Sequence, residues 1–552
     1  MSAGTQTTEG DAGTSTPTEA SQGNGNGGSN DNGGAPTTNA MRQMVAELQD
    51  KRTAALAMGG EKRIARQHER GKSTARERIE ALLDPDTFLE MGIHGSEYTS
   101  PNVPADGVIT GLGKIDGRPC CVAAYDFTVL GGSIGLVGEV KVTRLRELAL
   151  RNRVPMIWLV DSGGARIDPR PENLEKIPMF ADSGYMFREQ VTMSGVVPQV
   201  AAMVGPGAAG TAYIPGLADF VPMVKGTSSM ALGGPPLVKA AVGEDITAEE
   251  LGGSAVHNRE SGCADLQVKT DADCIQAIRD YLSFFPASCH HKPPRKEGAP
   301  GRAIMDDSIL DVLPDDSRKS YDMRKLIPLI VDDGFLFEMK PLYAKSLITG
   351  LSRIGGHPIG IVANNPKYLG GVLDSKAADK AARFVNLCDA FNIPLLFLVD
   401  VPGFVVGSEA EKSGIINHGS KMLYAVARAT VPKFTVIVRK AYGAGYYVMC
   451  GRAYEPDLIV AWPTAEISVM GPEGMMGIAG GKMLANVPDP EAFKEQMMQL
   501  IRPYIEPYQV ARRGLVDEVI DPRETRNVLI TGLELTRDKT VERPWRRHGV
   551  SP

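Results

Sequence analysis

The chain has 552 residues, a formal net charge of −6, and 43% hydrophobic and 23% charged residues. This length exceeds what one ordinary hydrophobic core accommodates, so at least two domains are expected. The negative net charge gives no general attraction to nucleic acid or to acidic membranes, and no apolar run approaches the roughly 20 residues that span a bilayer.

Residues 1–40 are rich in Thr, Gly, Asn and Ser, a composition that predicts a disordered tail. They lack the apolar run of a secretory signal, and acidic residues precede the first arginine, Arg42, which argues against a mitochondrial leader. The seven cysteines form no C-x-x-C pair, so a zinc ribbon is not indicated and a reducing compartment is favoured. A cytoplasmic protein is expected.

Residues 41–82 are expected to be helical and highly charged. Within them, Gly71-Lys72-Ser73-Thr74 resembles the end of a phosphate-binding P-loop. The full motif needs a glycine five positions before Gly71, where the chain has Arg66, and no strand precedes it. A solvated helix-to-turn segment is therefore expected here.

From about residue 105 strands alternate with helices, a pattern typical of α/β proteins. Strands are expected at 108–112, 120–124, 156–160 and 199–204, and a helix at 135–151. A Pro-, Gly- and Lys/Arg-rich linker at 286–302 precedes a second, similar pattern.

The second pattern repeats the first at a constant spacing of 239 residues over some 45 positions. The matching pairs are Gly117 with Gly356, Gly131 with Gly370, Lys141 with Lys380, Pro155 with Pro394, and Asp161 with Asp400. The chain is therefore predicted to be two copies of one fold, with domains at 41–290 and 300–546.

The most informative stretch is 204–213, V-G-P-G-A-A-G-T-A-Y, which follows an apolar strand and leads into an expected helix. Backbone N–H groups at a helix start can hold a negative oxygen. The stretch also fits G-x-G-x-x-G, the dinucleotide-binding fingerprint. That motif requires an acidic residue about 20 residues later, which is missing here, and Pro215-Gly216 interrupts the helix. A simple tight turn is another alternative. A twin at 439–447, R-K-A-Y-G-A-G-Y-Y, spaced by about 235, favours two equivalent anion holes.

Other catalytic patterns are weaker. Residues 131–135 match the G-x-S-x-G of hydrolases, but the duplicate has Val372 where the first copy has Ser133. Histidines are scattered, no H-E-x-x-H or carboxylate cluster occurs, and no metal is expected. The glycine turns thus come without an evident side-chain base.

Several motifs together resemble one family. They are 66–78, 161–166, 205–213, 251–253, 400–404, 439–443 and 461–465, and they resemble the carboxyltransferase (β) subunit of biotin-dependent acyl-CoA carboxylases over about residues 41–545. The resemblance implies two tandem crotonase-like (ββα superhelix) domains from an internal duplication. It also implies a homohexamer with active sites between the N-domain of one chain and the C-domain of another.

The implied reaction transfers CO2 from carboxybiotin to the α carbon (or the vinylogous γ carbon) of an acyl-CoA. Biotin supplies the base, and two backbone oxyanion holes hold the enolate and ureido oxygens. Position by position, the resemblance assigns the thioester hole to the amides of Ala209 and Gly210, and the biotin hole to those of Ala444 and Gly445. Relatives often have Gly at 209 and Gly-Ala at 444–445, so geometry is expected to differ.

The resemblance also assigns the binding residues. Substrate-binding positions are Gly163, Gly164, Ala165 and Tyr447, and biotin-binding positions are Tyr442, Gly443, Ala444 and Gly445. The bulky Tyr447 is unlike the usual propionyl-CoA pattern, and other motifs divide between the acetyl/propionyl and the methylcrotonyl/geranyl branches.

No Met-Lys-Met biotinylation site occurs, so a separate biotin carboxylase/biotin carboxyl carrier (α) subunit is the expected partner. Neither nucleic acid nor a membrane is expected to bind. The alternatives are a biotin-dependent acyl-CoA decarboxylase or transcarboxylase subunit, and a non-catalytic CoA-binding scaffold.

Overall fold

The computed structural model describes residues 37–97, 103–167, 178, 181, 185–299, 301, 306–484, 488–544 and 549–552. It divides into two units, one ending at Lys51 and one running from Arg52 to Pro552. The predicted tail at 1–40 lies mostly outside the described residues, but helix α1 begins at Thr37, so residues 37–40 are helical.

The expected helical segment 41–82 forms three helices. They are α1 (Thr37–Leu56), α2 (Glu61–Glu69) and α3 (Ala75–Leu82). Thr74 starts α3, because its hydroxyl accepts the Glu77 N–H and the Glu77 carboxylate accepts the Thr74 N–H.

The first sheet has the order β1-β2-β3-β4-β5-β6-β8, with β7 paired to the end of β5. Its strands are β1 (Leu89–Met91), β2 (Val108–Ile115), β3 (Arg118–Tyr125), β4 (Met156–Ser162), β5 (Gln199–Ala208), β6 (Pro222–Val224), β7 (Ser229–Ala231) and β8 (Leu266–Val268). Its helices are α4 (Leu136–Asn152), α5 (Tyr185–Met193), α6 (Gly210–Leu217), α7 (Pro235–Val242), α8 (Ala248–Gly252), α9 (Ser254–Arg259) and α10 (Asp271–Phe284). All expected strands and the expected helix are present.

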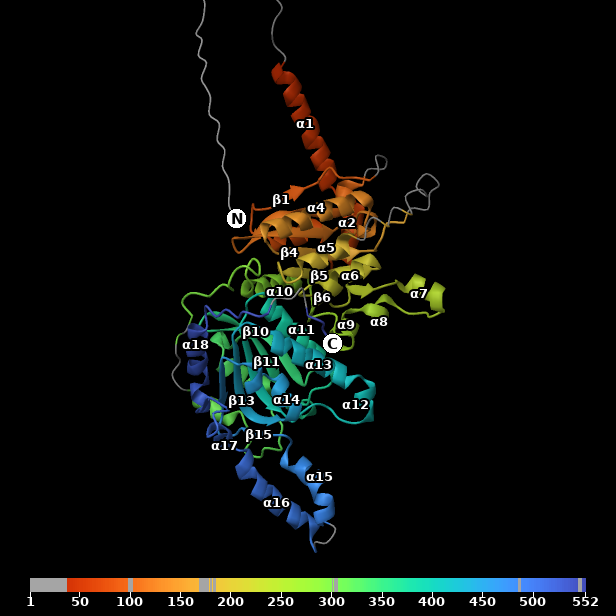
Figure 1. Ribbon diagram of the computed structural model, residues 1–552. Helices are drawn as coiled ribbons and strands as arrows, with labels where there is room; N and C mark the ends of the chain where they lie inside the picture. The colour runs from red at the N-terminus through yellow and green to blue at the C-terminus, as the bar shows by residue number, and fades with distance from the viewer. Residues whose placement is uncertain are drawn as a thin grey trace, which may run out of the picture. The chain divides into compact units, whose positions relative to one another are not determined.

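The second sheet repeats this order as β9-β10-β11-β12-β13-β14-β16, with β15 paired to β13 (Figure 1). Its strands are β9 (Phe337–Met339), β10 (Leu347–Ile354), β11 (His357–Asn364), β12 (Leu395–Val401), β13 (Lys433–Tyr442), β14 (Leu458–Ala461), β15 (Glu466–Ser468) and β16 (Glu518–Val519). Its helices are α11 (Ser375–Ala390), α12 (Ser408–Lys412), α13 (Ile415–Arg428), α14 (Gly443–Val448), α15 (Pro472–Leu484), α16 (Pro490–Ile505), α17 (Pro507–Ala511) and α18 (Thr525–Leu535).

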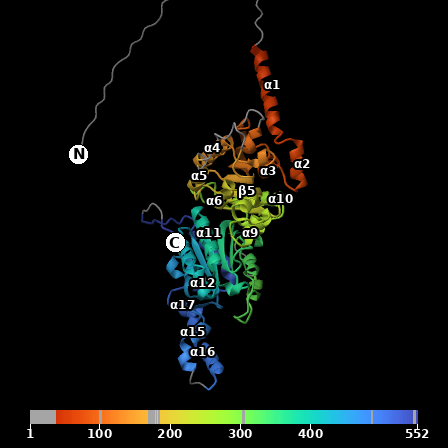
Figure 2. The same cartoon turned by 90° about the vertical axis from the view of Figure 1, so that its right-hand side faces the viewer.

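Helices cover both faces of the second sheet because both faces of its strands are apolar. In β10, Leu347 and Leu351 pack with α11, whereas Ile348 and Ile354 pack with α18. The two helices accordingly lie on opposite sides of the strands (Figure 1). Helices α15 and α16 lie next to each other in both views (Figure 1 and Figure 2). β10 is antiparallel to β9 and β11, whereas β12 and β13 pair in parallel and are buried almost throughout, as is typical of buried parallel strands.

The predicted duplication is visible strand by strand. Met156 of β4 pairs with Gln199 of β5, and Leu395 of β12 pairs with Lys433 of β13. The spacing is 239 residues up to β4 and 234 along β5 and β13, where about 235 was expected. The domain limits at 290 and 300 remain a prediction, although the two sheets lie on either side of the linker.

Lys141 and Lys380, which match in the repeat, have the same structural role in the two halves. Lys141 donates to the carbonyls of Ala105 and Val108 (2.7 and 2.6 Å). Lys380 donates to those of Lys340, Tyr343 and Leu347 (2.9, 2.9 and 2.7 Å). Each ammonium satisfies the buried carbonyls of the loop that enters β2 or β10.

Lys380 is expected to make the free energy of unfolding rise with pH. Burial lowers its pKa from 10.5 to about 7, so above pH 7 the unfolded chain binds a proton that the folded chain releases, and stability rises by up to about 1.4 kcal/mol per pH unit. Thermal unfolding at pH 7, 8 and 9 checks this: Lys380→Met lowers the slope of stability against pH by up to about 1.4 kcal/mol per pH unit, whereas Lys376→Met, at a half-exposed position, leaves it unchanged. Equal slopes in both variants contradict the assignment.

Candidate active site

Two turns meet at the carboxyl ends of β4 and β5. Gly163 and Gly164 follow β4, and Ala209 and Gly210 follow β5. Gly164 has a φ of +96°, and a Cβ atom placed on it would lie 2.7 Å from the Ala208 carbonyl oxygen. The two turns are therefore in contact, and this contact requires glycine at 164. The carboxyl ends of parallel strands are where α/β proteins place their ligands.

Ala165 is held with its amide turned away from the neighbouring loop. The backbone N–H of Ile134 donates to the Gly164 carbonyl (2.8 Å), and the backbone N–H of Arg166 donates to the Ile134 carbonyl (2.9 Å). In this parallel-bridge pattern the N–H of Ala165, which lies between the two bonded residues, points away from Ile134. The second half repeats it, since Leu373 donates to Gly403 (3.1 Å) and Val405 to Leu373 (2.9 Å). Phe404 is thus the counterpart of Ala165.

The predicted thioester pair behaves unequally. Ala209 has a φ of +51°, and its N–H donates to the Ala231 carbonyl at 3.1 Å, so this amide is engaged within the chain. Gly210 begins α6, where the first N–H groups have no intrahelical acceptor. Room is available around Gly210, since an added Cβ would lie 3.5 Å from the Phe187 ring.

The second turn follows β13. Gly207 pairs with Met230 and Ala441 pairs with Ile467, so with the spacing of 234 Ala209 corresponds to Gly443, which also has a positive φ of 54°. Gly210 therefore corresponds to Ala444, one residue earlier than expected. Ala444 is exposed and lies in the first turn of α14.

Of the remaining predicted positions of the second turn, Gly445 and Tyr442 are packed, whereas Tyr447 is half-exposed. A Cβ on Gly445 would lie 2.8 Å from a Val401 methyl group, so glycine is required there. Tyr442 is buried and its hydroxyl donates to the Glu466 carboxylate. The pKa of the phenol is raised mainly by burial and further by the negative charge of Glu466. Tyr447 is half-exposed, with its ring stacked on Tyr454 at a centroid distance of 6.4 Å.

The G-x-S-x-G pattern is a backbone contact. Gly132 has a φ of +61°, and an added Cβ would lie 2.3 Å from the Asp161 carbonyl oxygen. Its counterpart Gly371 would place a Cβ 2.6 Å from the Asp400 carbonyl oxygen. Both halves have a glycine here because the chain passes close to a strand end in each of them. The serine has no such role, which agrees with its replacement by Val372 in the second half.

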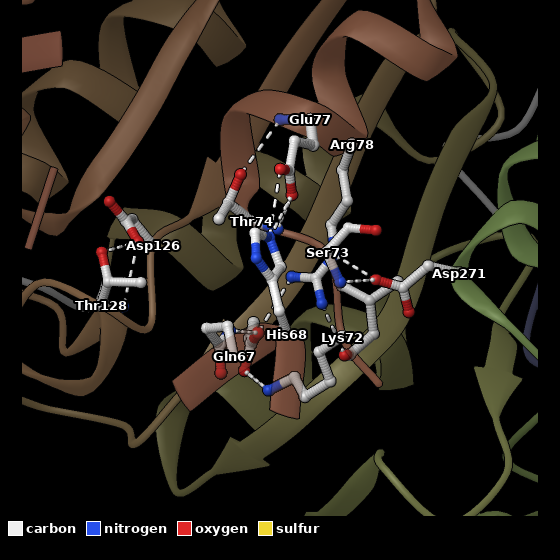
Figure 3. A network of polar contacts seen from close by, with 12 residues as sticks. Gln67, His68, Lys72, Ser73, Thr74, Glu77, Arg78, Asp126, Thr128 and Asp271 are labelled. Atoms are coloured by element: carbon white, nitrogen blue, oxygen red, sulfur yellow. Dashed lines mark hydrogen bonds and ion pairs between the residues drawn. The ribbon is translucent and has the colours of Figure 1, made fainter. Parts of the chain in front are cut away.

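A buried ion cluster lies beneath the turns at 163–165 and 209–210. The Asp161 carboxylate, which has no exposure, accepts hydrogen bonds from Lys72 Nζ (2.7 Å), Arg78 (2.9 Å) and Gln67 (3.1 Å). Arg78 also donates to Asp271 (2.7 Å), as Figure 3 shows. Burial lowers the pKa of Lys72, against the attraction of Asp161.

The expectation of a solvated segment at 71–74 is wrong for its lysine. Lys72 has 5% exposure and forms part of this cluster. The signal that could have found it is the repeat itself: Asp400 has Arg439 at 2.9 Å, whereas the position equivalent to Arg439 is Gly205. Because the strand next to Asp161 supplies no cation, this buried carboxylate needs one from another segment of the chain.

Comparison with known proteins agrees with this geometry. The carboxyl transferase domain model matches residues 66–551. The chain belongs to the carboxyl transferase family. It is 42% identical to the propionyl-CoA carboxylase carboxyltransferase subunit of Haloferax mediterranei, covering 93% of this chain and 99% of that one. It is 41% identical to the methylmalonyl-CoA decarboxylase subunit alpha of Veillonella parvula, covering 93% and 99%.

Among solved structures, the chain is similar to a transcarboxylase 12S crystal structure, described as a hexamer with methylmalonyl-coenzyme A and methylmalonic acid bound. The TM-score is 0.88 at 42% identity, covering 95% of this chain and 100% of that one. The predicted family and the tandem crotonase-like fold are confirmed. In the part of the chain that the structure describes, no helix is long and apolar enough to cross a membrane, and no three metal-binding side chains gather.

Gly205→Ala is expected to disrupt the ion cluster. An added Cβ would lie 1.8 Å from Asp161 Oδ1 and 2.9 Å from Lys72 Nζ, and displacing a fully bonded buried carboxylate costs about 3–5 kcal/mol. Gly216→Ala, in α6 with no atom within 4 Å of the added Cβ, is the matched control and should leave stability unchanged or higher. Thermal unfolding of both variants checks this, and equal midpoints contradict it.

Proposed function

We propose that this chain is the carboxyltransferase component of a biotin-dependent acyl-CoA carboxylase, and that it moves CO2 from carboxybiotin to the α (or vinylogous γ) carbon of an acyl-CoA. The observation that carries the proposal is the pair of matched turns, each a strand end followed by a helix start, in a chain of the carboxyl transferase family.

On the acyl side, we assign the thioester oxygen to the Gly210 N–H at the start of α6. The Ala165 N–H, on the turn that contacts the β5 turn, supplies a second donor, since the Ala209 N–H is engaged by Ala231. Gly163 and Gly164 allow the close approach of these two turns. Two N–H donors and a helix start stabilise an enolate oxygen without a side-chain acid.

On the biotin side, the exposed Ala444 and the buried Gly445 lie in the first turn of the corresponding helix, and Phe404 occupies the place of Ala165. Bound biotin would supply the base that removes the substrate proton. Tyr442, fixed by Glu466, and Gly443 keep this turn in place. Tyr447, half-exposed on the same helix, is assigned to the acyl pocket.

The assembly proposed is a homohexamer core with a separate biotin carboxylase/biotin carboxyl carrier (α) partner. The similar transcarboxylase 12S structure is a hexamer, which supports this assembly. Exposed apolar side chains on α7 and α15 support burial between copies, namely Leu237, Val242 and Ile478. All seven cysteines are free, which fits the proposed cytoplasmic location.

A second candidate is the decarboxylase direction. The 41% identity to the methylmalonyl-CoA decarboxylase subunit alpha supports it, and the same turns would serve the reverse transfer. The partner discriminates the two, because an ATP-using biotin carboxylase drives carboxylation and a membrane-bound pump accompanies decarboxylation.

The proposal is tested with the purified chain, its biotin-bearing partner, ATP, bicarbonate and acyl-CoAs of two to ten carbons. We expect carboxylation of at least one member of the series, measured as fixed radioactive bicarbonate that depends on both protein and acyl-CoA. Fixation independent of acyl-CoA across the whole series refutes the proposal.

Removal of one donor distinguishes a catalyst from a CoA-binding scaffold. Two variants of Gly210 are made in an Ala209→Gly background, because Ala209 has φ 51° and ψ −122°, and its Cβ would meet the ring of a following proline. Gly210→Pro deletes the N–H at the first position of α6, where proline is compatible with a helix, and should lower kcat by about 100- to 1000-fold. Gly210→Ala keeps the N–H and has room for its methyl group, so it should stay within about tenfold of wild type. Equal activities in the two variants, both assembled, refute the assigned donor.

A further inference from the structure

The Asp161 carboxylate lies between the two strand ends that carry the acyl-side turns. It belongs to β4, immediately before the turn at 163–165, and its oxygen packs against Gly205 of β5, ahead of the turn at 209–210. Its side chain is fully buried, so its position is set by its protein partners alone. A displacement of this carboxylate would therefore disturb the two strand ends that lead into the turns.

The cations that hold Asp161 come from outside the sheet. Lys72 lies between α2 and α3, and Arg78 lies on α3; their side chains have 5% and 1% exposure. Arg78 also donates to the Val204 carbonyl (3.0 Å), so it joins β4 and β5 directly. Lys72 additionally lies over the Phe127 ring, 4.7 Å from its centroid.

The second half reaches the same arrangement without such an insert. Asp400, equally buried, accepts from Arg439 Nε (2.9 Å) and from the Lys440 N–H (3.2 Å), and both residues belong to β13 itself. Gly205 occupies the position of Arg439 in the first half. Its missing side chain leaves the space that the Asp161 carboxylate and the Lys72 ammonium fill.

We propose that Lys72 and Arg78 are positioning residues of the acyl side. They hold Asp161, and through it the turns at 163–165 and 209–210, in the arrangement that binds the acyl-CoA thioester oxygen. Arg439 performs the same task for the biotin side from within its own strand. This inference rests on the proposed function. It implies that the two sides are set by different cations and can be impaired separately.

The test compares Lys72→Met with Arg76→Met in the full chain assembled with its biotin-bearing partner. Arg76 lies on α3 but pairs with Glu90 (2.8 Å) and not with Asp161, so it is the matched control. Two rates are measured: carboxylation of acyl-CoA, and release of CO2 from carboxybiotin on the partner in the absence of acyl-CoA.

We expect Lys72→Met to lower kcat/KM for acyl-CoA by about 10-fold or more while CO2 release stays within about twofold of wild type. Arg439→Met should lower CO2 release as well, and Arg76→Met should change neither rate. Equal losses of both rates in assembled Lys72→Met, or no loss of either, overturn the inference. Absence of both rates in the wild-type chain instead refutes the proposed function.

A milder variant covers the case in which Lys72→Met fails to assemble. Gln67→Leu removes one hydrogen bond to Asp161 (3.1 Å) and keeps both cations. We expect a loss of about threefold, confined to acyl-CoA carboxylation. Unchanged acyl-CoA carboxylation in this variant overturns the inference.

Discussion

A carboxylate without access to water is the constraint on which the first half depends. Asp161 is tolerated inside the sheet only because three donors surround it, since an unpaired buried charge is prohibitively costly. The donors come from the segment between Gln67 and Arg78, so the chain that precedes the sheet is needed to complete it. The duplicated half solves the same electrostatic problem with Arg439 in the strand.

The chemistry proposed for the site is carried by the backbone, which explains why few of the predicted residues have functional side chains. What matters at Gly164, Gly210 and Gly445 is how closely two turns approach and where an N–H points. Side chains such as Glu466, which holds Tyr442, act by fixing the backbone. Stabilisation of developing charge depends on donors that are already oriented before the reaction begins.

The sequence was sufficient for the duplicated fold, because glycine pairs, Lys141 with Lys380, and the strand ends recur at one spacing. It was insufficient for the register after β4, where a spacing of 234 assigns Ala444, rather than Gly445, as the counterpart of Gly210. It also missed Lys72, because a lysine in a charged helical segment has the pattern of a solvated residue. Contacts between segments far apart in the chain, such as that of Lys72 with Asp161, leave no periodicity in a single sequence. The hydrogen bond from Ala209 to Ala231 was hidden for the same reason.

Aromatic residues at the junction of the two halves join them into one hydrophobic core. Phe220 and Tyr281 stack at a centroid distance of 4.4 Å, and Phe337 of the second half packs against both. Phe285 likewise contacts Phe391, so one hydrophobic core includes residues of both copies. Separation of the two copies would therefore expose large aromatic surfaces to water. The two glycine turns are thus held in one inseparable hydrophobic unit.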